Sequence, residues 1–139
     1  MKVLVTGSRG FIGKNLCIFL EEKKHTVLEV HRETSNNDIL SHINEADIVF
    51  HLAGENRPLE SSGFEIGNVE LTSFITDSIT NSNKNIPIVF SSSTQAEKNN
   101  DYGKSKLAAE AIIQSYSAAT GADYYIFRLP NVFGKWCKP

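Results

Sequence analysis

The stretch KVLVTGSRGFIG, residues 2–13, decides the fold. It begins with the apolar run KVLV, which is long enough for one buried strand. Three glycines then follow at intervals of three, Gly7, Gly10 and Gly13, and after Gly10 the apolar residues recur with the period of a helix. The stretch therefore predicts a strand, a glycine-rich turn and a helix over about residues 11–23.

Dinucleotide-binding folds place a pyrophosphate at such a junction. Gly7 allows a sharp turn, Gly10 lets the backbone approach the phosphates, and Gly13 lets the helix pack closely on the strand. The free N–H groups at the start of the helix, around Phe11 and Ile12, then face the anion. The spacing is G-x-x-G-x-x-G rather than the commoner G-x-G-x-x-G, so a glycine-rich turn without a ligand stays open as an alternative.

The composition restricts the class of protein. A chain of 139 residues with 40% hydrophobic residues fits one globular domain, residues 1–139. A net charge of −2 gives no reason to expect nucleic acid or an anionic membrane as partner, and no apolar run could span a bilayer. The N-terminus predicts a strand rather than a signal peptide. Cys17 and Cys137 are too few and too far apart for a disulfide framework, which indicates a reducing cytoplasm, with Cys17 a core residue of its helix. No metal site is predicted.

Strands and helices alternate along the rest of the chain. This alternation predicts a Rossmann-type, doubly wound parallel sheet of about five strands with helices on both faces. The expected strands are 2–5, 26–30, 46–52, 86–90 and 124–129, and the expected helices are 11–23, a short one starting near 35–38, 64–82 and 102–119.

The end of the second strand reads the ribose of a dinucleotide. An acid there binds a 2′-hydroxyl, whereas a basic residue accepts a 2′-phosphate. His31 and Arg32 directly follow that strand, no acid occurs before Glu33, and Arg9 in the glycine turn could reach the same place. The sequence therefore favours NADP(H) over NAD(H), with solvated surface arginines as the alternative.

The end of the third strand also faces the expected cofactor. His51 fits a half-buried, hydrogen-bonded histidine at a strand end better than a functional residue. Leu52, Ala53 and Gly54 follow, and small residues at a strand end suit a backbone packed against a ligand. Arg57, in the next loop, is a candidate to bind an anionic group of the substrate.

Tyr102 and Lys106 lie four residues apart on one expected helix, so their side chains share a face. A tyrosine with a pKa near 10 is a poor base, but a nearby ammonium and the positive end of the helix would lower that pKa. The tyrosine then serves as proton donor or acceptor for an alcohol–carbonyl pair, and the Ser93 hydroxyl can hydrogen-bond the same carbonyl. Alone, Tyr-x-x-x-Lys is a common accident, and its specificity comes from the serine-rich strand end and the dinucleotide turn.

With these motifs in place, the chain resembles the extended short-chain dehydrogenase/reductases that act on nucleotide sugars. Within that family it is most similar to the N-terminal part of CapF-type capsular-polysaccharide reductases. The family motifs are TGSRGFIG (Thr6 to Gly13), HLAG (His51 to Gly54), Asn68, SSST (Ser91 to Thr94), YGKSK (Tyr102 to Lys106) and RLPNVFG (Arg128 to Gly134). The closer likeness comes from NRP (Asn56 to Pro58), SSSTQA (Ser91 to Ala96) and NVFGKWCKP (Asn131 to Pro139).

The resemblance implies NADPH-dependent reduction of a UDP-linked 4-keto-6-deoxy N-acetylamino sugar. By that likeness Ser93 positions the 4-keto oxygen, Tyr102 protonates it, and Lys106 holds Tyr102 and the nicotinamide ribose. The resemblance also adds Asn68, Arg128, Pro130 and Asn131 to the cofactor-side residues. It implies a homodimer formed through the helices at about 64–82 and 102–119.

Two alternatives stay open. Relatives continue beyond the position of Pro139 through a substrate-binding region, so we expect this chain to be an N-terminal fragment, and it could be a non-catalytic NADP(H)-binding module. The reaction could also be 4-epimerisation. A 4,6-dehydratase is disfavoured because Gln95, not an acid, follows Thr94.

Overall fold

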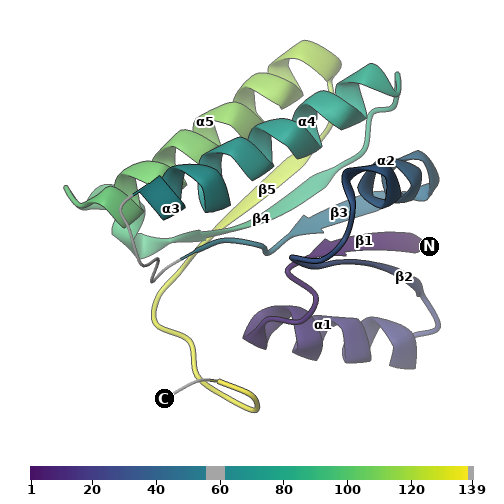
Figure 1. The fold of residues 1–139 in the computed structure, drawn as a ribbon, viewed down its shortest axis with the longest axis horizontal. Coiled ribbons are helices and arrows are strands. Elements are labelled where there is room, and N and C mark those ends of the chain that lie inside the picture. The colour runs from purple at the N-terminus through teal and green to yellow at the C-terminus, as the bar shows by residue number, and fades with distance from the viewer. Residues whose placement is uncertain (56–61, 138–139) are drawn as a thin grey trace.

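The computed structural model describes residues 1–55 and 62–137, and its core is a five-stranded parallel sheet in the order β2-β1-β3-β4-β5. Figure 1 shows the strands at the centre with helices on either side. The strands are β1 (Lys2–Thr6), β2 (Thr26–Val30), β3 (Ile48–His51), β4 (Ile88–Ser93) and β5 (Tyr124–Leu129). The helices are α1 (Phe11–Glu22), α2 (Asn36–Glu45), α3 (Ser62–Phe64), the π-helical η1 (Glu65–Glu70), α4 (Leu71–Asn81), the 3₁₀ turn η2 (Thr94–Glu97) and α5 (Asp101–Thr120). The predicted doubly wound α/β fold is confirmed.

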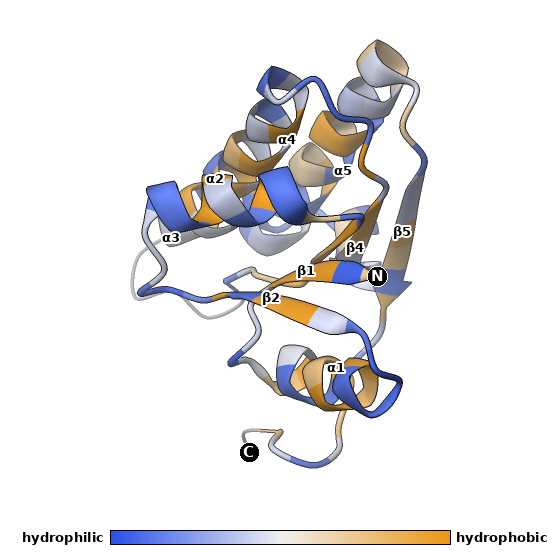
Figure 2. Ribbon diagram, turned by 90° about the vertical axis from the view of Figure 1, so that its right-hand side faces the viewer, coloured by the Kyte–Doolittle hydropathy of each residue, from blue (hydrophilic) through white to orange (hydrophobic). Residues whose placement is uncertain are grey.

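Two apolar clusters cover the two faces of the sheet. Figure 2 shows α1 on one side of the strands and α2, α4 and α5 on the other. Val3 and Val5 of β1 pack with Cys17 and Leu20 of α1. Leu4, the residue between the two valines, belongs to the larger cluster that includes α2, α4 and α5. The period-two alternation of a strand thus divides β1 between two cores.

The topology creates a crevice between β1 and β3. The chain leaves β1 for β2 across one face by way of α1, whereas it leaves β3 for β4 across the other face by way of α3, η1 and α4. The connections that follow β1 and β3 therefore diverge where Thr6 pairs with His51. Open α/β sheets bind ligands at such a switch point, outside the carboxyl ends of the strands.

Two predicted strands differ from the observed strands by two residues or more at one end or both. The third begins at Ile48 rather than residue 46, because Ala46 closes α2 by donating its N–H to the carbonyl of His42. The fourth runs from Ile88 to Ser93 rather than ending at residue 90. Serine has little intrinsic preference for strands, but β5 pairs with β4 up to Ser93, and this pairing overrides the local preference.

The helix predicted over residues 64–82 consists of α3, η1 and α4. Its middle part, Glu65–Glu70, is π-helical, so the backbone there is wider than in an α-helix. The wider turn also explains why the apolar residues of this segment do not follow one helical stripe. π-helical turns are frequent at functional sites, and this one carries the buried Asn68.

The cysteines agree with their predicted roles. Cys17 lies on the buried face of α1. Burial raises the pKa of its thiol to about 11, so the thiol stays protonated and unreactive at neutral pH. Cys137 is exposed, and neither cysteine forms a disulfide bond. Within residues 1–55 and 62–137, no helix has the length and apolarity that a bilayer crossing requires.

Candidate functional site

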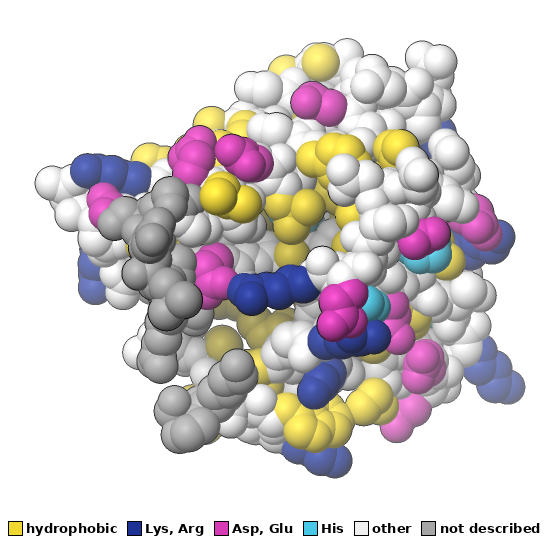
Figure 3. Space-filling view, in the orientation of Figure 1, with side chains coloured by type: hydrophobic (Ala, Val, Ile, Leu, Met, Phe, Trp, Pro, Cys, Tyr) yellow, Lys and Arg dark blue, Asp and Glu magenta, His cyan; other side chains and the backbone are white. Residues whose placement is uncertain are grey.

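A cleft of about 1190 Å³ lies at the carboxyl edge of the sheet, where the ends of all five strands meet the start of α1 and α5. Figure 3 shows charged side chains of both signs gathered around a hollow on this face. Most residues predicted for a site line this cleft. They are Gly7, Arg9, Gly10, Phe11, Ile12, Gly13, His31, Arg32, Leu52, Ala53, Gly54, Ser93, Tyr102, Lys106, Pro130 and Asn131.

The glycine turn is packed so tightly that two of its positions exclude any side chain. Gly7 has φ of 70°, and a Cβ there would lie 2.8 Å from the backbone nitrogen of Ala53. A Cβ on Gly13 would lie 2.1 Å from the carbonyl oxygen of Gly7. The first glycine therefore lets the turn touch the end of β3, and the third lets α1 touch the turn.

The start of α1 is open to an anion. Gly10 is the N-cap and contributes no side chain, and the first turn of the helix carries no acidic residue. The first intrahelical bond runs from the N–H of Lys14 to the carbonyl of Gly10, which leaves the earlier N–H groups of the helix without intrahelical acceptors. Since Gly10, Phe11, Ile12 and Gly13 all line the cleft, this end of it fits a diphosphate.

The basic residues expected at a 2′-phosphate are ion-paired with acids. Arg9 donates to Glu33 over 2.7 Å, and Arg32, at the end of β2, pairs with Glu55, at the end of β3. Both arginines are exposed, and both pairs lie on the wall of the cleft. Surface pairs of this kind contribute little stability, so a phosphate can compete for the guanidinium groups. Arg57 and the Asn56–Pro58 motif lie outside the described residues.

Ser93, Tyr102 and Lys106 meet at the other end of the cleft. Ser93 is the last residue of β4, and Tyr102 lies in the first turn of α5, whose N-terminus is capped by the side chain of Asn100. Lys106 is only 4% exposed. Its Nζ donates to the carbonyl of Ser91 over 3.0 Å and lies 4.9 Å from the centre of the Phe90 ring.

The prediction that Lys106 lowers the pKa of Tyr102 is wrong. Burial raises the pKa of the Tyr102 phenol, and only a hydrogen bond with Ser93 opposes the rise. The Lys106 ammonium lies 5.9 Å from the centre of the tyrosine ring and is hydrogen-bonded to Ser91. Burial also lowers the pKa of Lys106, to about 8, against the raising effect of Glu110. Without a ligand Tyr102 is therefore a protonated phenol at neutral pH, suited to donate a proton.

Asn68 and Arg128, both predicted to contact the cofactor, do not line the cleft. Asn68 is 1% exposed, accepts from the N–H of Glu55 over 3.0 Å and donates to the carbonyl of Glu55 and to the Ser105 hydroxyl. It thus ties the chain after β3 to α5. Arg128 donates hydrogen bonds to Glu110 on α5 and to Glu97 at the end of η2. In both cases a buried protein partner binds the polar group that the sequence assigned to a ligand.

A hydrogen-bonded relay that the sequence did not predict supports the floor of the cleft. His51 is 1% exposed; its Nδ1 lies 2.7 Å from the Thr6 hydroxyl and its Nε2 2.9 Å from the Thr72 hydroxyl. Thr72 donates its proton to the carbonyl of Asn68, so it accepts from Nε2–H. Thr6 then donates to Nδ1.

The Thr6 hydroxyl also accepts the N–H groups of Leu52 and Ala53, at 3.1 and 3.0 Å. The relay therefore joins the end of β1, the end of β3 and α4. Each threonine hydroxyl donates its proton to one acceptor: Thr6 to His51, and Thr72 to the carbonyl of Asn68. The sequence signal was a threonine directly before Gly7 and a histidine in the facing strand, and it was too general to assign this role.

We expect acid to destabilise the protein through His51. Burial, with a smaller contribution from Lys106, lowers the pKa of His51 from 6.5 to about 3. Below pH 6.5 the unfolded chain therefore binds a proton that the folded chain excludes, and stability falls as the pH falls. Between pH 7 and pH 5 the loss is about 2 kcal/mol.

Urea unfolding at the two pH values measures this loss. His51→Gln should be less stable at pH 7 but should lose much less between pH 7 and pH 5, whereas His25→Gln should keep the full loss. Equal losses in His51→Gln and the unaltered chain would contradict the assignment.

Both the sequence and the fold of the chain match known proteins. Residues 3–139 match the NAD dependent epimerase/dehydratase family. The chain is 47% identical over its whole length to UDP-2-acetamido-2,6-beta-L-arabino-hexul-4-ose reductase of Pseudomonas aeruginosa strain PA103. It superposes with a TM-score of 0.87 and 41% identity on the capsular polysaccharide assembling protein CapF of Staphylococcus aureus. UDP-glucuronic acid 4-epimerase of Bacillus cereus, solved with NAD, shares the fold at 19% identity and a TM-score of 0.86.

The matched region is one part of longer proteins. The whole of this chain aligns in each comparison, but it spans 38% of the P. aeruginosa reductase, 37% of the S. aureus CapF chain and 60% of the B. cereus epimerase.

Proposed function

Because this chain belongs to the NAD dependent epimerase/dehydratase family, we propose that its cleft binds NADP(H) for a reductase. The substrate we propose is a UDP-linked 4-keto-6-deoxy N-acetylamino sugar, reduced at its 4-keto group in the synthesis of a capsular or other surface polysaccharide. The observation that carries this proposal is that Ser93, Tyr102 and Lys106 line the same cleft as the glycine turn. The 47% identity to a 4-ketosugar reductase supports the choice of substrate class.

Residues at the two ends of the cleft would bind different parts of the cofactor. The N–H groups at the start of α1 hold the diphosphate, with Gly7, Gly10 and Gly13 keeping the backbone close to it. Leu52, Ala53 and Gly54 border its middle. A Cβ on Gly54 would lie 2.9 Å from Nζ of Lys106, so the absence of a side chain keeps the Lys106 ammonium accessible to the ribose.

The chemistry at the Tyr102 end is proton donation to a carbonyl oxygen. A bound reduced nicotinamide supplies the hydride that adds to the carbonyl carbon. The Ser93 hydroxyl hydrogen-bonds the carbonyl oxygen and orients it. The Tyr102 hydroxyl would then donate its proton to that oxygen, so the C=O double bond becomes a C–O single bond with a new C–H and a new O–H bond, and Tyr102 is left as a phenolate. Lys106, cationic at neutral pH, stabilises the phenolate that remains.

Incubating the purified protein with NADPH and the UDP-linked 4-keto sugar tests the proposal. Loss of NADPH absorbance with formation of the 4-hydroxy sugar supports it. Saturable NADPH binding without turnover supports the alternative of a cofactor-binding module. Absence of NADPH and NADH binding would contradict both.

We propose a preference for NADP(H) because Arg9 and Arg32 line the adenosine end of the cleft. Arg9→Ala should raise the Kd for NADPH about tenfold, the effect of one charge-assisted phosphate contact, and leave the Kd for NADH within about twofold. Glu33→Gln frees Arg9 from its partner and should tighten NADPH binding. Isothermal titration of both cofactors measures these changes, and equal losses for NADPH and NADH in Arg9→Ala would contradict the preference.

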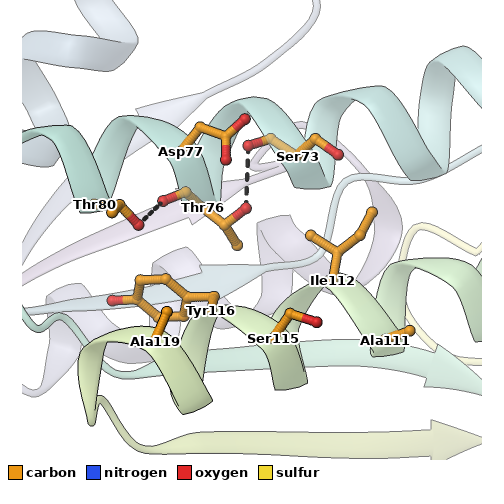
Figure 4. Close-up of a pocket in the computed structure, with 9 residues that line it drawn as sticks. All are labelled: Ser73, Thr76, Asp77, Thr80, Ala111, Ile112, Ser115, Tyr116 and Ala119. Carbon is orange, nitrogen blue, oxygen red and sulfur yellow. Dashed lines mark hydrogen bonds between the residues drawn. The ribbon is translucent and has the colours of Figure 1, made fainter.

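We also propose that two copies associate through α4 and α5. The location we propose is the cytoplasm, where nucleotide sugars and NADPH are available. A shallow groove between these helices, of about 500 Å³, is bordered by small side chains such as Ser73, Ala111, Ser115 and Ala119 (Figure 4). The hydroxyls of Thr76 and Thr80 donate to carbonyl groups of their own helix. Because these donors are already satisfied, a helix of a second copy can approach this surface closely. A sedimentation mass of one chain would contradict this association.

A further inference from the structure

Three ionisable residues follow one another at four-residue intervals on α5: Tyr102, Lys106 and Glu110. The first two belong to the cleft, whereas Glu110 does not line it. Glu110 is 3% exposed and Lys106 is 4% exposed. Among the residues that the structure describes, these are the two buried side chains that carry a full charge at neutral pH, and they lie one helical turn apart.

Each carboxylate oxygen of Glu110 has a partner on the sheet. Oε1 accepts from the Ser92 hydroxyl and from Nε of Arg128, which is 3.0 Å away. Oε2 accepts from Nη2 of Arg128 over 2.8 Å, so the guanidinium binds the carboxylate in a two-pronged fashion. Ser92 and Arg128 are directly paired residues of β4 and β5, so one carboxylate holds the ends of two neighbouring strands against α5.

The residues next to this network form the reactive end of the cleft. Ser93 follows Ser92, and Leu129, Pro130 and Asn131 follow Arg128. All four line the cleft. Glu97, on the 3₁₀ turn after Ser93, accepts the remaining hydrogen bond of Arg128 over 2.9 Å and adds a second, exposed tie.

We propose that Glu110 is a positioning residue for the reaction, which balances the charge of Lys106 and, with Ser92 and Arg128, fixes the strand ends that present Ser93 and Asn131. This inference rests on the proposed function of the cleft. It adds a requirement on α5 beyond Tyr102 and Lys106: a buried acid one turn further along the helix.

The groups around Lys106 show why this acid matters. From α5 it faces Tyr102 and Glu110; from β3 it faces His51, which is neutral at pH 7; from β4 it contacts the Ser91 carbonyl and the Phe90 ring. Glu110 is thus the negative charge among these neighbours. Burial drives the pKa of Lys106 down to about 8, and the attraction of Glu110 opposes that fall. Without Glu110 we expect Lys106 to lose its proton close to neutral pH.

Direct titration of Lys106 tests the proposal without a cofactor or substrate. The whole chain is prepared with ¹³C- and ¹⁵N-labelled lysine, and Lys106→Arg identifies the signal. In Glu110→Gln the Lys106 pKa should fall by at least about one unit, so the protonated fraction at pH 7 falls from about nine-tenths to half or less. Glu97→Gln is the matched control: it removes the other acid bound to Arg128 and should leave the Lys106 pKa unchanged.

Arg128→Gln keeps the test valid where Glu110→Gln fails to fold. It removes the cation that competes for Glu110, so the Lys106 pKa should rise, opposite to the first variant. An unchanged Lys106 pKa in either variant, or equal shifts in Glu110→Gln and Glu97→Gln, overturns the proposal. Because the titration uses cofactor-free protein, this outcome is distinct from failure of NADPH to bind.

Discussion

Replacing Tyr102 with Phe should lower kcat for reduction of the UDP-linked 4-keto sugar by about 10²- to 10⁴-fold, the contribution of a positioned general acid. In the proposed reaction the phenol donates the proton beside Ser93, and burial raises its pKa and keeps it protonated at neutral pH. The phenylalanine ring retains the packing against Phe64, whose ring centre lies 5.8 Å away. NADPH affinity should therefore stay within about twofold. NADPH consumption and isothermal titration measure the two quantities in any preparation of this chain that turns the sugar nucleotide over.

Tyr116→Phe is a matched control on the same helix. Tyr116 donates its hydroxyl proton to the carbonyl of Ile86 over 2.8 Å and lies away from the cleft. Its loss should cost about 1 kcal/mol of stability and leave kcat unchanged. Turnover retained in Tyr102→Phe, or lost equally in both variants, would contradict the role of Tyr102.

Replacing Gly13 with Ala should abolish measurable cofactor binding, with the Kd for NADPH rising at least about 100-fold. The new methyl group would lie 2.1 Å from the carbonyl oxygen of Gly7 and 2.9 Å from Cα of Ser8, so α1 and the turn must separate. Overpacking typically costs 1–3 kcal/mol, and alanine returns up to about 1 kcal/mol through its helix preference. Since the obstructing atoms are backbone, we expect a net loss of about 2 kcal/mol, measured by urea unfolding beside the titration.

Gly10→Ala separates packing from binding. A Cβ on Gly10 meets one atom within 4 Å, the Gly7 carbonyl oxygen at 3.1 Å, so the variant should lose much less stability than Gly13→Ala. It should still weaken NADPH binding, because the methyl group stands where the diphosphate approaches the backbone. Gly13→Ala binding NADPH as well as Gly10→Ala does would contradict the packing argument.

The sequence predicted the features that depend on local pattern. The apolar run before Gly7, the glycine spacing and the apolar period after Gly10 together predict β1, the turn and α1. The four-residue interval between Tyr102 and Lys106 likewise predicts that both side chains leave one face of α5. Each of these inferences needs a single segment, and the structure brings the segments together in one cleft.

The remaining features depend on partners from distant segments. Arg128 appeared to be a cofactor contact because the sequence could not reveal that Glu110 and Glu97 accept its hydrogen bonds. The lowered pKa predicted for Tyr102 ignored burial, which acts in the opposite direction and outweighs the other effects. Ser91–Ser93 became strand because β5 pairs with them. In each case tertiary structure changed the role that a residue's type suggested.

The most direct test is ¹⁵N NMR of the chain titrated with NADPH. The central proposition is that one dinucleotide spans the cleft, with its diphosphate at the start of α1 and its nicotinamide beside α5. The amide signals of Phe11, Ile12 and Gly13, and those of Tyr102 and Lys106, should then shift together and saturate with a single Kd. Saturable shifts at only one of these two groups, or at neither, would contradict the account.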